Sequence, residues 1–571
     1  MIKFKNKKTE RVKYGILKGK HLHIALCILL FCGANLLIKA QAISNNFYSE
    51  NAWMPDSIGE GANKVFLNGH LHDNWENVRK SNVKLVRFGG QTADYNMPSR
   101  FQYLRMVDSI RAKGMEPILQ LSKGNSNYDT LDALPIFRYI NVTMNRHVKY
   151  WIIGNEPDLY TTNKTASKIS AYIKRYAQAM KNIDNTILII GPEMTSIKPE
   201  DSNAPVQKIV DSLMNTSWSG NILGLITSGS GAGKGFIDFF SWHMYNNYDG
   251  LTSTKSRSWL IDRLTTTDSL RMGRMKRKLD SCNIVLGRTS QPVKPIITEA
   301  NICYYSDTNF VANDNWQGVK GNSFFAGQFW CEAMAIGVNR GLEWINFWSV
   351  MEKTGLGFMT NSTSARKSTY YHMQAMGQWY TGTNYLGSDK STTSNADIKN
   401  LKAFGSKDGN HIAVFIMNQD SLLVVPTNRA YSIRLNGSYP SSDTNRITLS
   451  MGIDRTYRDT IEAASTTLLV FDLNGNISEK YIYKQFDGST QPGFHQKYPQ
   501  CGNSITYTQS TLDAYYPAVY SNITIGNGTN QIQVKNTDNS IFHAVNSITL
   551  NKNFLMLPGQ TLSLIIDPTC Q

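Results

Sequence analysis

Two glutamate residues follow apolar runs of the sequence in the same way. Glu156 comes shortly after Tyr150–Ile153, and Glu299 comes shortly after Pro295–Ile297. Runs rich in β-branched residues are typical of buried parallel strands. Two carboxyl groups held about 5 to 5.5 Å apart can hydrolyse a glycosidic bond with retention, one as the nucleophile and the other as acid and then base. We therefore predict that Glu156 and Glu299 face each other across a sugar ring.

Five further residues at predicted strand ends suit the same chemistry. Asn155 supplies an amide that can hold a sugar 2-hydroxyl. Tyr245 can donate to the nucleophile carboxylate and keep it ionised, and His243 can support the site by a hydrogen bond. Trp348 offers an indole face for a pyranose ring, and Arg87 can bind a hydroxyl or a carboxylate. We predict all five as substrate-binding residues; the alternatives are a core histidine, a packing tryptophan and a structural ion pair of the arginine.

Residues 43–384 alternate predicted strands with predicted helices, which favours parallel strands. The predicted strands are 148–153, Val83–Phe88, Met115–Leu121, Thr186–Ile190, Phe236–His243, Ile296–Glu299 and Leu342–Trp348, with a first strand between residues 45 and 68. The predicted helices are Leu71–Lys80, Phe101–Lys113, Leu131–Asn145, Ala166–Lys181, Val206–Met214, Ser256–Lys278, Ser323–Val338 and Tyr370–Tyr380. Eight such units make an α/β protein with a (β/α)8 TIM barrel, in which the carboxyl ends of strands four and seven share one face. A doubly wound open sheet is the alternative, but no Gly-x-Gly-x-x-Gly follows any strand.

The pattern changes beyond residue 384. In residues 385–484 short apolar runs alternate with Asn, Gly, Ser and Asp turns, which is typical of an antiparallel β-sandwich. Residues 485–500 resemble a linker, and residues 503–571 again read as strands, so that 485–571 forms a further β-rich segment or a small β module. No internal repeat is evident in the sequence.

The N-terminus has the pattern of an export signal. A basic stretch, Lys3–Lys20, precedes the apolar segment Ile24–Ile38, and Ala40–Ala42 offers small residues at the cleavage spacing. Residues 1–42 are therefore predicted to be a signal peptide, with no stable membrane span after its removal. The mature chain would be secreted, periplasmic or held at the cell surface; an uncleaved signal anchor is the alternative.

Charge and cysteine content narrow the function classes. The formal charge of +16 falls to +8 once residues 1–42 are removed, because 50 basic and 42 acidic residues remain. This mild excess, without a basic run interleaved with aromatics, excludes nucleic acid as the expected partner. After residue 42 the cysteines are Cys282, Cys303, Cys331, Cys501 and Cys570, and the last two could form a disulfide. None has zinc-ligand spacing, so we expect no metal.

These motifs resemble glycoside hydrolase clan A over roughly residues 50–380. The resemblance rests on Asn155-Glu156-Pro157, His243-Met244-Tyr245 and Glu299, in that order along the chain. Arg87-Phe88-Gly89-Gly90 and Ile153–Tyr160 are most similar to the heparanase and β-glucuronidase family. The resemblance implies Glu156 as acid/base, Glu299 as nucleophile, no cofactor, and a β-sandwich packed on the barrel. Arabinofuranosidases, xylosidases and glucanases of the clan share much of it.

The expected protein is a secreted retaining glycoside hydrolase that acts on a polysaccharide or oligosaccharide. Its sugar is open among hexuronides, pentosides and hexosides. Two other classes remain: a carbohydrate-binding barrel without activity, and a surface-anchored structural protein. The first would release no chromophore from aryl glycosides, and the second would retain Lys3–Lys20 on the mature chain.

Overall fold

The computed structural model describes most of the chain from residue 41 to residue 566. Described are residues 41–52, 71–95, 97–122, 131–159, 165–214, 225, 236–247, 256–303, 321, 323–352, 356–360, 364–390, 400–420, 428–436 and 445–485, and, from 492 to 566, the strands named below with residue 551. The chain divides into two units, Met1–Gln41 and Ala42–Gln571. The predicted signal peptide therefore lies almost wholly outside the described residues. No helix within them has both the length and the apolar character needed to cross a membrane.

Eight parallel strands close into a barrel, as the sequence predicted. They are β2 (Tyr48–Ala52), β3 (Leu85–Phe88), β4 (Glu116–Leu121), β5 (Tyr150–Ile153), β6 (Leu188–Met194), β7 (Phe239–Asn247), β8 (Lys294–Cys303) and β9 (Ile345–Phe347), paired in this order, with β9 returning to β2. The first strand, which the sequence placed only between residues 45 and 68, is β2. Two short parallel strands, β10 (Met351–Glu352) and β11 (Met359–Thr360), follow the last barrel strand.

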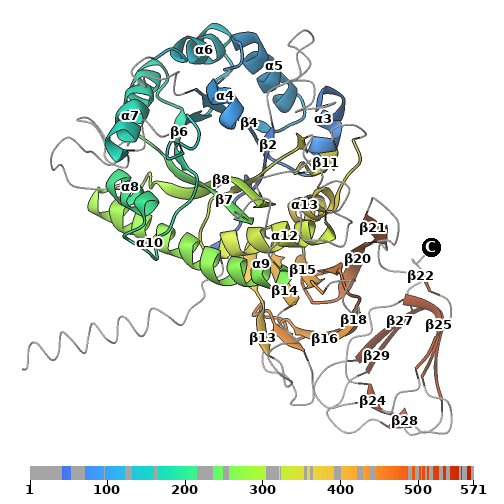
Figure 1. Ribbon diagram of the computed structural model, residues 1–571. Coiled ribbons are helices and arrows are strands. Elements are labelled where there is room, and N and C mark those ends of the chain that lie inside the picture. Colours follow the sequence, from blue (N-terminus) through green and yellow to red (C-terminus); the bar gives the residue numbers. More distant parts are fainter. Residues whose placement is uncertain are drawn as a thin grey trace, which may run out of the picture. The chain divides into compact units, whose positions relative to one another are not determined.

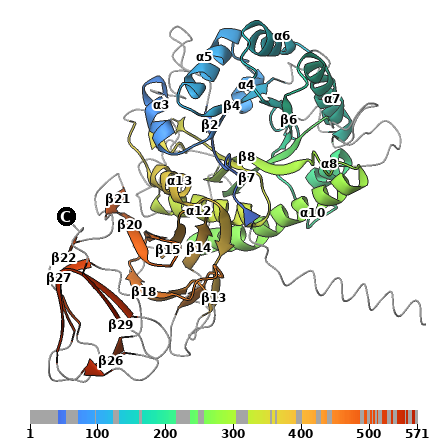
Figure 2. The same cartoon turned by 180° about the vertical axis from the view of Figure 1, so that it is seen from behind.

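Helices surround the barrel, as Figures 1 and 2 show from opposite sides. They are α3 (Leu71–Lys80), α4 (Gln91–Tyr95), α5 (Arg100–Arg111), α6 (Leu134–Arg138), α7 (Ala166–Ile183), α8 (Pro205–Leu213), α9 (Arg257–Asp262), α10 (Ser269–Val285), α12 (Phe324–Asn339) and α13 (Ser368–Trp379). Two predicted helices contain a π-helical segment: η1 (Tyr139–Thr143) continues α6, and η3 (Arg263–Asp268) joins α9 to α10. Side-chain caps begin several helices; Ser99, for example, makes a capping box with Gln102 at the start of α5.

The barrel interior is apolar near the start of the strands. One buried cluster there contains Leu85, Ile118, Tyr150, Ile152, Ile190, Phe239, Ile296 and Trp344. Each such side chain contributes about 1.5–3 kcal/mol when it leaves water. Towards the carboxyl ends of the strands the inward residues become polar, beginning with Arg87 two positions after Leu85. The apolar residues therefore fill the barrel below a polar layer that lies at the face where such barrels do chemistry.

Two sheets form the predicted sandwich. The larger runs in the order β1 (Gln41–Ala42), β12 (Thr383–Leu386), β14 (Leu401–Lys407), β15 (Ile412–Asn418), β19 (Ser465–Phe471), β20 (Ile477–Gln485) and β21 (Pro492–His495). The smaller runs β13 (Ser388–Lys390), β17 (Arg446–Thr448), β16 (Arg429–Arg434) and β18 (Thr456–Ile461). Most pairs are antiparallel, but β16 and β17 are parallel. Because β21 pairs with β20, residues 492–495 belong to the sandwich and not to a linker.

The larger sheet is buried on both faces. Alternate residues of β14 and β15 pack against the smaller sheet in one core cluster, and the others join the core of the barrel helices. Tyr380 contacts Phe404 edge to face, and Gln328 of α12 donates to the Ser465 carbonyl at 2.8 Å. This continuous core fixes the sandwich on the α12 and α13 side of the barrel.

The C-terminal strands wind as a coil, which the sequence did not reveal. One sheet contains β22 (Cys501–Gly502), β23 (Ile505–Tyr507), β25 (Val519–Ile525), β27 (Ser540–Leu550) and β29 (Leu562–Ile566); the other contains β24 (Thr511–Leu512), β26 (Ile532–Val534) and β28 (Phe554–Leu555). All pairs are parallel, and successive strands alternate between the sheets. Thr511 pairs with Gln533 and Ser540 with Leu562, each 22 residues apart. Other paired residues lie 18 positions apart (Cys501 and Val519) or 25 (Ile523 and Ile548), so the turns of the coil are unequal in length; parallel stacking of this kind is that of a β-helix. Cys570 lies outside the described residues.

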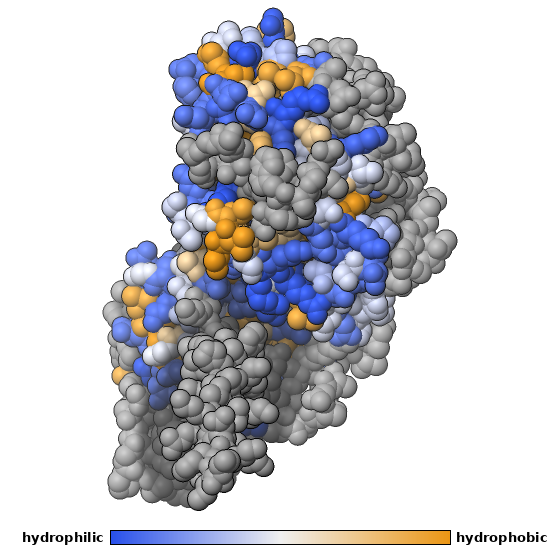
Figure 3. Space-filling model, turned by 90° about the vertical axis from the view of Figure 1, so that its left-hand side faces the viewer, coloured by the Kyte–Doolittle hydropathy of each residue, from blue (hydrophilic) through white to orange (hydrophobic). Residues whose placement is uncertain are grey.

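The side of the molecule that carries α7, α8 and α10 in Figure 1 is mostly hydrophilic, with small separate apolar patches (Figure 3). On α10, Lys276 pairs with Asp280, and Lys278 pairs with Asp211 of α8. The basic end of this helix is thus a solvated face with ion pairs among the described residues.

Candidate active site

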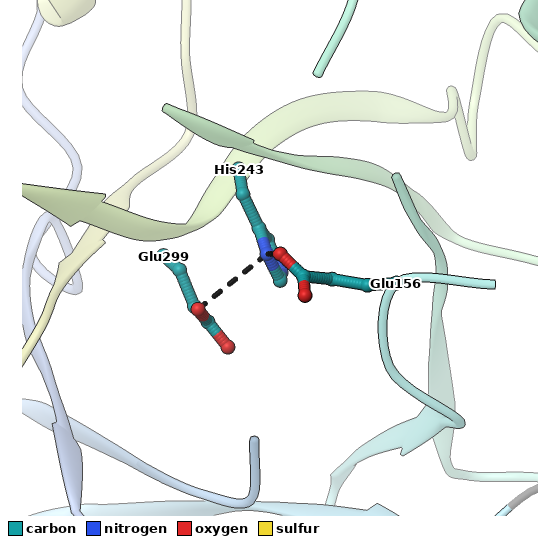
Figure 4. Close-up of side chains that lie close together, drawn as sticks. All are labelled: Glu156, His243 and Glu299. Atoms are coloured by element: carbon teal, nitrogen blue, oxygen red, sulfur yellow. Dashed lines mark hydrogen bonds and ion pairs between the residues drawn. The ribbon is translucent and has the colours of Figure 1, made fainter. Parts of the chain in front are cut away.

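Glu156 and Glu299 meet at the carboxyl-terminal end of the barrel. Glu156 lies just after β5, and Glu299 lies within β8, with His243 of β7 beside both (Figure 4). One oxygen of each carboxylate and one nitrogen of the imidazole all lie within 4.8 Å of one another. This separation matches a retaining glycosidase, because an inverting enzyme needs about 6.5–9.5 Å to admit a water.

The turn after β5 places Glu156 by an unusual backbone path. Gly154 and Glu156 both have positive φ, at 77° and 43°. The second value is uncommon for a residue with a side chain. Hydrogen bonds hold the turn: the Gly154 N–H donates to Leu121 at 2.8 Å, and the Glu156 N–H donates to the Glu193 carbonyl at 3.0 Å. The backbone of two neighbouring strands therefore fixes the direction of the Glu156 side chain.

Arg87 lies beneath the two glutamates and is fully buried. Its guanidinium donates to Glu299 Oε1 and to Glu193 Oε2, both at 2.8 Å. It also donates to Asn51 and Asn155 at 2.8 Å and to Gln120 at 3.1 Å. The sequence proposed Arg87 as a contact for substrate. Its hydrogen bonds to described residues all go to protein side chains and it has no exposed surface, so in this structure it orients the carboxylate of Glu299; a contact with substrate stays a prediction.

The two glycines after β3, Gly89 and Gly90, lie against protein side chains. A Cβ on Gly89 would lie 2.3 Å from the Gln120 amide, and one on Gly90 would lie 2.6 Å from the Trp348 ring. These glycines make room for protein side chains. Trp348 therefore packs over Gly90, and only 6% of it is exposed.

His243 bridges Glu156 and a third glutamate, Glu193. Its Nδ1 lies 2.8 Å from Glu156 Oε1 and 3.5 Å from Glu299 Oε2, and its Nε2 lies 3.4 Å from Glu193 Oε2. Burial by itself would lower the pKa of His243, but the carboxylates of Glu299, Glu156 and Glu193 outweigh it and raise that pKa to about 10. The imidazole is therefore a cation at neutral pH and donates from both nitrogens.

Glu193 is the buried counter-charge of this site. Burial would raise its pKa, but Arg87 and His243 lower the pKa to about 2. Its other oxygen accepts from Thr298 at 2.8 Å. The sequence analysis did not select Glu193. A signal was present, since the apolar run Leu188–Ile190 is followed by a glutamate just as the runs before Glu156 and Glu299 are.

The two candidate catalytic carboxyls have different surroundings. Burial, helped by the negative charge of Glu299, raises the pKa of Glu156 against the opposing effect of His243. Glu299 accepts from Arg87 on Oε1 and from Tyr245 on Oε2, each at 2.8 Å. Two donors thus orient the carboxylate of Glu299, while burial raises the pKa of Glu156 and favours its protonated form. This is the division of labour that acid and nucleophile require.

Asn155 is nearly buried between Arg87 and Asp94. Its side-chain oxygen accepts from Arg87, and its backbone N–H donates to Asp94 at 3.0 Å. Its amide nitrogen makes no hydrogen bond to any of the described residues. That nitrogen is the atom through which the predicted contact with a sugar hydroxyl would form.

A pocket of about 610 Å³ opens beside Glu156, His243 and Tyr245. It extends over the loop after β6 towards α8, η3 and α10, and its wall includes Thr195, Lys198, Asn246, Asp268 and Arg271. Volumes of about 300–1,000 Å³ are usual for small-molecule sites. Glu156, the candidate acid/base, therefore borders a space large enough for a sugar residue.

Glu156, His243 and Glu299 are also close enough to share a cation. The protonated imidazole of His243, however, has no lone pair to offer, and Arg87 already adds positive charge beside Glu299. This chemistry fits proton transfer better than metal binding.

Comparison with known proteins identifies the fold. Neither a family model nor a curated protein matches the sequence. Among solved structures, the chain is similar to a family 51 α-L-arabinofuranosidase from Bifidobacterium longum, with 13% identity, a TM-score of 0.51 and coverage of 76% of this chain and 97% of that one. It is similar also to an α-L-arabinofuranosidase from Thermotoga maritima, solved in complex with arabinose, with 16% identity, a TM-score of 0.51 and coverage of 76% and 98%. At these identities the likeness shows a shared architecture, a TIM barrel with a C-terminal β-sandwich.

Proposed function

We propose that this protein is a retaining glycoside hydrolase in which Glu299 is the nucleophile and Glu156 the acid/base. The observation that carries the proposal is the pair of carboxyl oxygens within 4.8 Å at the carboxyl end of the barrel, in unlike surroundings. The shared fold with two arabinofuranosidases supports it. An inactive binding barrel would not need a buried network that orients Glu299 with two donors and raises the pKa of Glu156.

In the first step Glu299 attacks the anomeric carbon, and the bond to the leaving oxygen breaks as Glu156 gives that oxygen its proton. Arg87 and Tyr245 hold the attacking carboxylate in position. The product is a glycosyl ester of Glu299, whose negative charge is gone. That charge helped to raise the pKa of Glu156, so the pKa falls in the intermediate.

In the second step Glu156 removes a proton from water, and the water oxygen attacks the anomeric carbon. The ester bond breaks, Glu299 leaves as a carboxylate, and Glu156 is again protonated. His243 stays a cation throughout and stabilises whichever of Glu156 and Glu299 carries negative charge.

The sugar at this site is proposed from two lines of argument. The motif resemblance around Arg87 favours a hexuronide, while the solved structures of the same fold include enzymes that act on arabinofuranosides. Because Arg87 is buried under Glu299, it does not itself favour an acidic sugar. The first screen should therefore use 4-nitrophenyl α-L-arabinofuranoside, β-xyloside, β-glucoside and β-glucuronide.

Glu299→Ala and Glu156→Ala test the assignment on whichever aryl glycoside the screen selects. Glu299→Ala should lower kcat by roughly 10⁵-fold. Glu156→Ala should lose about 10²–10⁴-fold on leaving groups that need a proton, and much less on 4-nitrophenolate. Azide should then give a glycosyl azide of inverted configuration with Glu299→Ala and of retained configuration with Glu156→Ala, as read by NMR.

Three results would refute the proposal: no hydrolysis of any glycoside, undiminished hydrolysis by both variants, or azide products of the opposite configurations. Glu343→Ala is a matched control, because this glutamate lies before β9 and pairs with Lys294, away from the pocket.

Export is also part of the proposal and rests on Lys3–Ala42 alone. Mass spectrometry of the N-terminus of protein recovered from the producing cells tests it. A chain that begins near Ile43 supports export, and a chain that retains Lys3–Lys20 supports the anchored alternative.

A further inference from the structure

The pocket lies on one side of the catalytic pair. Its wall contains Glu156 but not Glu299. In the proposed reaction Glu156 touches the oxygen that leaves, so the group attached to that oxygen must lie on the Glu156 side. The pocket is therefore in the position of the leaving group and not of the sugar that becomes bonded to Glu299.

The far wall of this pocket carries buried polar groups that are only loosely paired with one another and with two arginines. Asn246, at the end of β7, is 1% exposed, and neither its amide nitrogen nor its amide oxygen makes a hydrogen bond of normal geometry. Asp268, at the start of α10, is 3% exposed, and its Oδ2 has no donor. Because these groups line the pocket and lack hydrogen bonds of normal geometry, they can take further hydrogen bonds from a ligand.

Two arginines lie close to Asp268, but neither makes a hydrogen bond of normal length to its carboxylate. Arg263 Nε lies 3.6 Å and Arg271 Nη1 lies 3.7 Å from its carboxylate oxygens, just beyond hydrogen-bonding distance. Arg271 is engaged with Glu200. The amide of Asn246 faces the same carboxylate. An amide, a carboxylate and a guanidinium at one wall offer donors and acceptors together, which is the set that neighbouring hydroxyl groups need.

The remaining wall is apolar. Trp242, Met244 and Met272 line it between the polar groups. A sugar ring presents C–H faces as well as hydroxyls, and a wall of this mixed kind suits both.

We propose that this pocket is a leaving-group subsite, in which Asn246 and Asp268 hydrogen-bond the hydroxyls of a second sugar residue. The enzyme would then act on the bond between two sugar residues in preference to a simple alkyl or aryl glycoside. This inference rests on the proposed function, because the leaving-group side is defined by the role of Glu156.

Two variants test the subsite on paired substrates. The substrates are the 4-nitrophenyl glycoside that the screen selects and the disaccharide of the same glycone, such as xylobiose for the xyloside or cellobiose for the glucoside. Asp268→Asn and Asn246→Leu should each lower kcat/KM for the disaccharide by about 10-fold to 100-fold. The same variants should change kcat/KM for the aryl glycoside by less than about 3-fold, because a nitrophenyl ring makes no such hydrogen bonds.

Stability separates a binding role from a structural one. Asn246→Leu replaces an unpaired buried amide by an apolar side chain of similar size, so its melting temperature should be equal to or above that of the wild type. Asp280→Asn is the matched control for Asp268→Asn, since it makes the same change on α10 at a side chain that is 48% exposed and pairs with Lys276. It should leave both substrates unaffected.

Equal losses on both substrates, or no loss on the disaccharide, would overturn the subsite while leaving the proposed hydrolysis intact. A wild-type protein that cleaves neither substrate class would overturn the proposed function and the subsite with it. Hydrolysis of the aryl glycoside by the wild type distinguishes the two failures, because it continues when only the subsite is wrong and is absent when the proposed function is wrong.

Discussion

The inside of the barrel has two layers built from the same strands. On β3, Leu85 belongs to the apolar layer and Arg87 to the polar one; on β4, Ile118 and Gln120 divide in the same way. Both layers are buried, but they are held together differently. The apolar layer depends on packing alone, whereas the polar layer depends on charges that must balance without water.

The charges of the polar layer can be counted residue by residue. Arg87 and the protonated His243 face the carboxylates of Glu193 and Glu299, so two positive charges meet two negative ones. Glu156 fits this neutral cluster best when it holds its proton. The protonation of Glu156 therefore depends on the polar layer as a whole, and not only on the groups that touch this side chain. Changes in the polar layer should therefore alter chemistry, and changes in the apolar layer should alter stability only.

The largest effect is expected for Arg87→Met. This variant keeps much of the side-chain volume but leaves Glu193 and Glu299 without their cation, so it should destabilise the protein by about 3–5 kcal/mol. It should also reduce kcat by at least about 10²–10³-fold, because the nucleophile loses a donor. Chemical denaturation and aryl-glycoside kinetics measure the two losses. Full activity in this variant would show that Arg87 does not position Glu299.

A smaller, directional effect is expected for His243→Gln. Glutamine can still donate to Glu156 but carries no charge, so the pKa of Glu156 should rise further. Activity requires protonated Glu156 and is lost as pH rises through that pKa. The basic limb of the kcat/KM profile should therefore move to higher pH by roughly one unit or more. A limb that moves to lower pH, or a limb that disappears, would mean that His243 itself is the group that titrates.

The smallest effect is expected in the apolar layer. Ile118→Val removes one methylene two residues before Gln120 and should destabilise the protein by about 0.5–1.5 kcal/mol. Its kcat and its basic limb should match those of the wild type, measured beside the two polar-layer variants. A shift of the basic limb of the kcat/KM profile in this variant would contradict the separation of the two layers. It would show that packing in the apolar layer also sets the charge balance of the polar layer.

The sequence was sufficient for much of the architecture. Buried β-branched runs separated by amphipathic helices predicted eight parallel strands, and the closed barrel confirms this. Short strands with turn residues between them predicted the sandwich. The coil of residues 501–566 was missed, because paired residues lie anywhere from 18 to 25 positions apart and no fixed sequence period marks the turns of the coil.

The sequence also pointed to Glu156, Glu299, His243 and Tyr245, because each follows or lies in a strand whose end could be located. It did not show Glu193, although that residue holds both cations of the site. Nor did it show that Arg87 is fully buried against Glu193 and Glu299. Residue type and spacing indicate which face a side chain occupies, but not how deeply it is buried.

The sequence by itself determined the order of the strands and the pair of carboxylates at their ends, because both follow from local patterns of apolar and polar residues. Only the tertiary structure decided how those carboxylates are charged. The register shift in β8 directs the consecutive residues Thr298 and Glu299 both into the barrel, where one reaches Glu193 and the other reaches Arg87. Such contacts join residues more than 100 positions apart, and the pKa of a buried group depends on all of them at once.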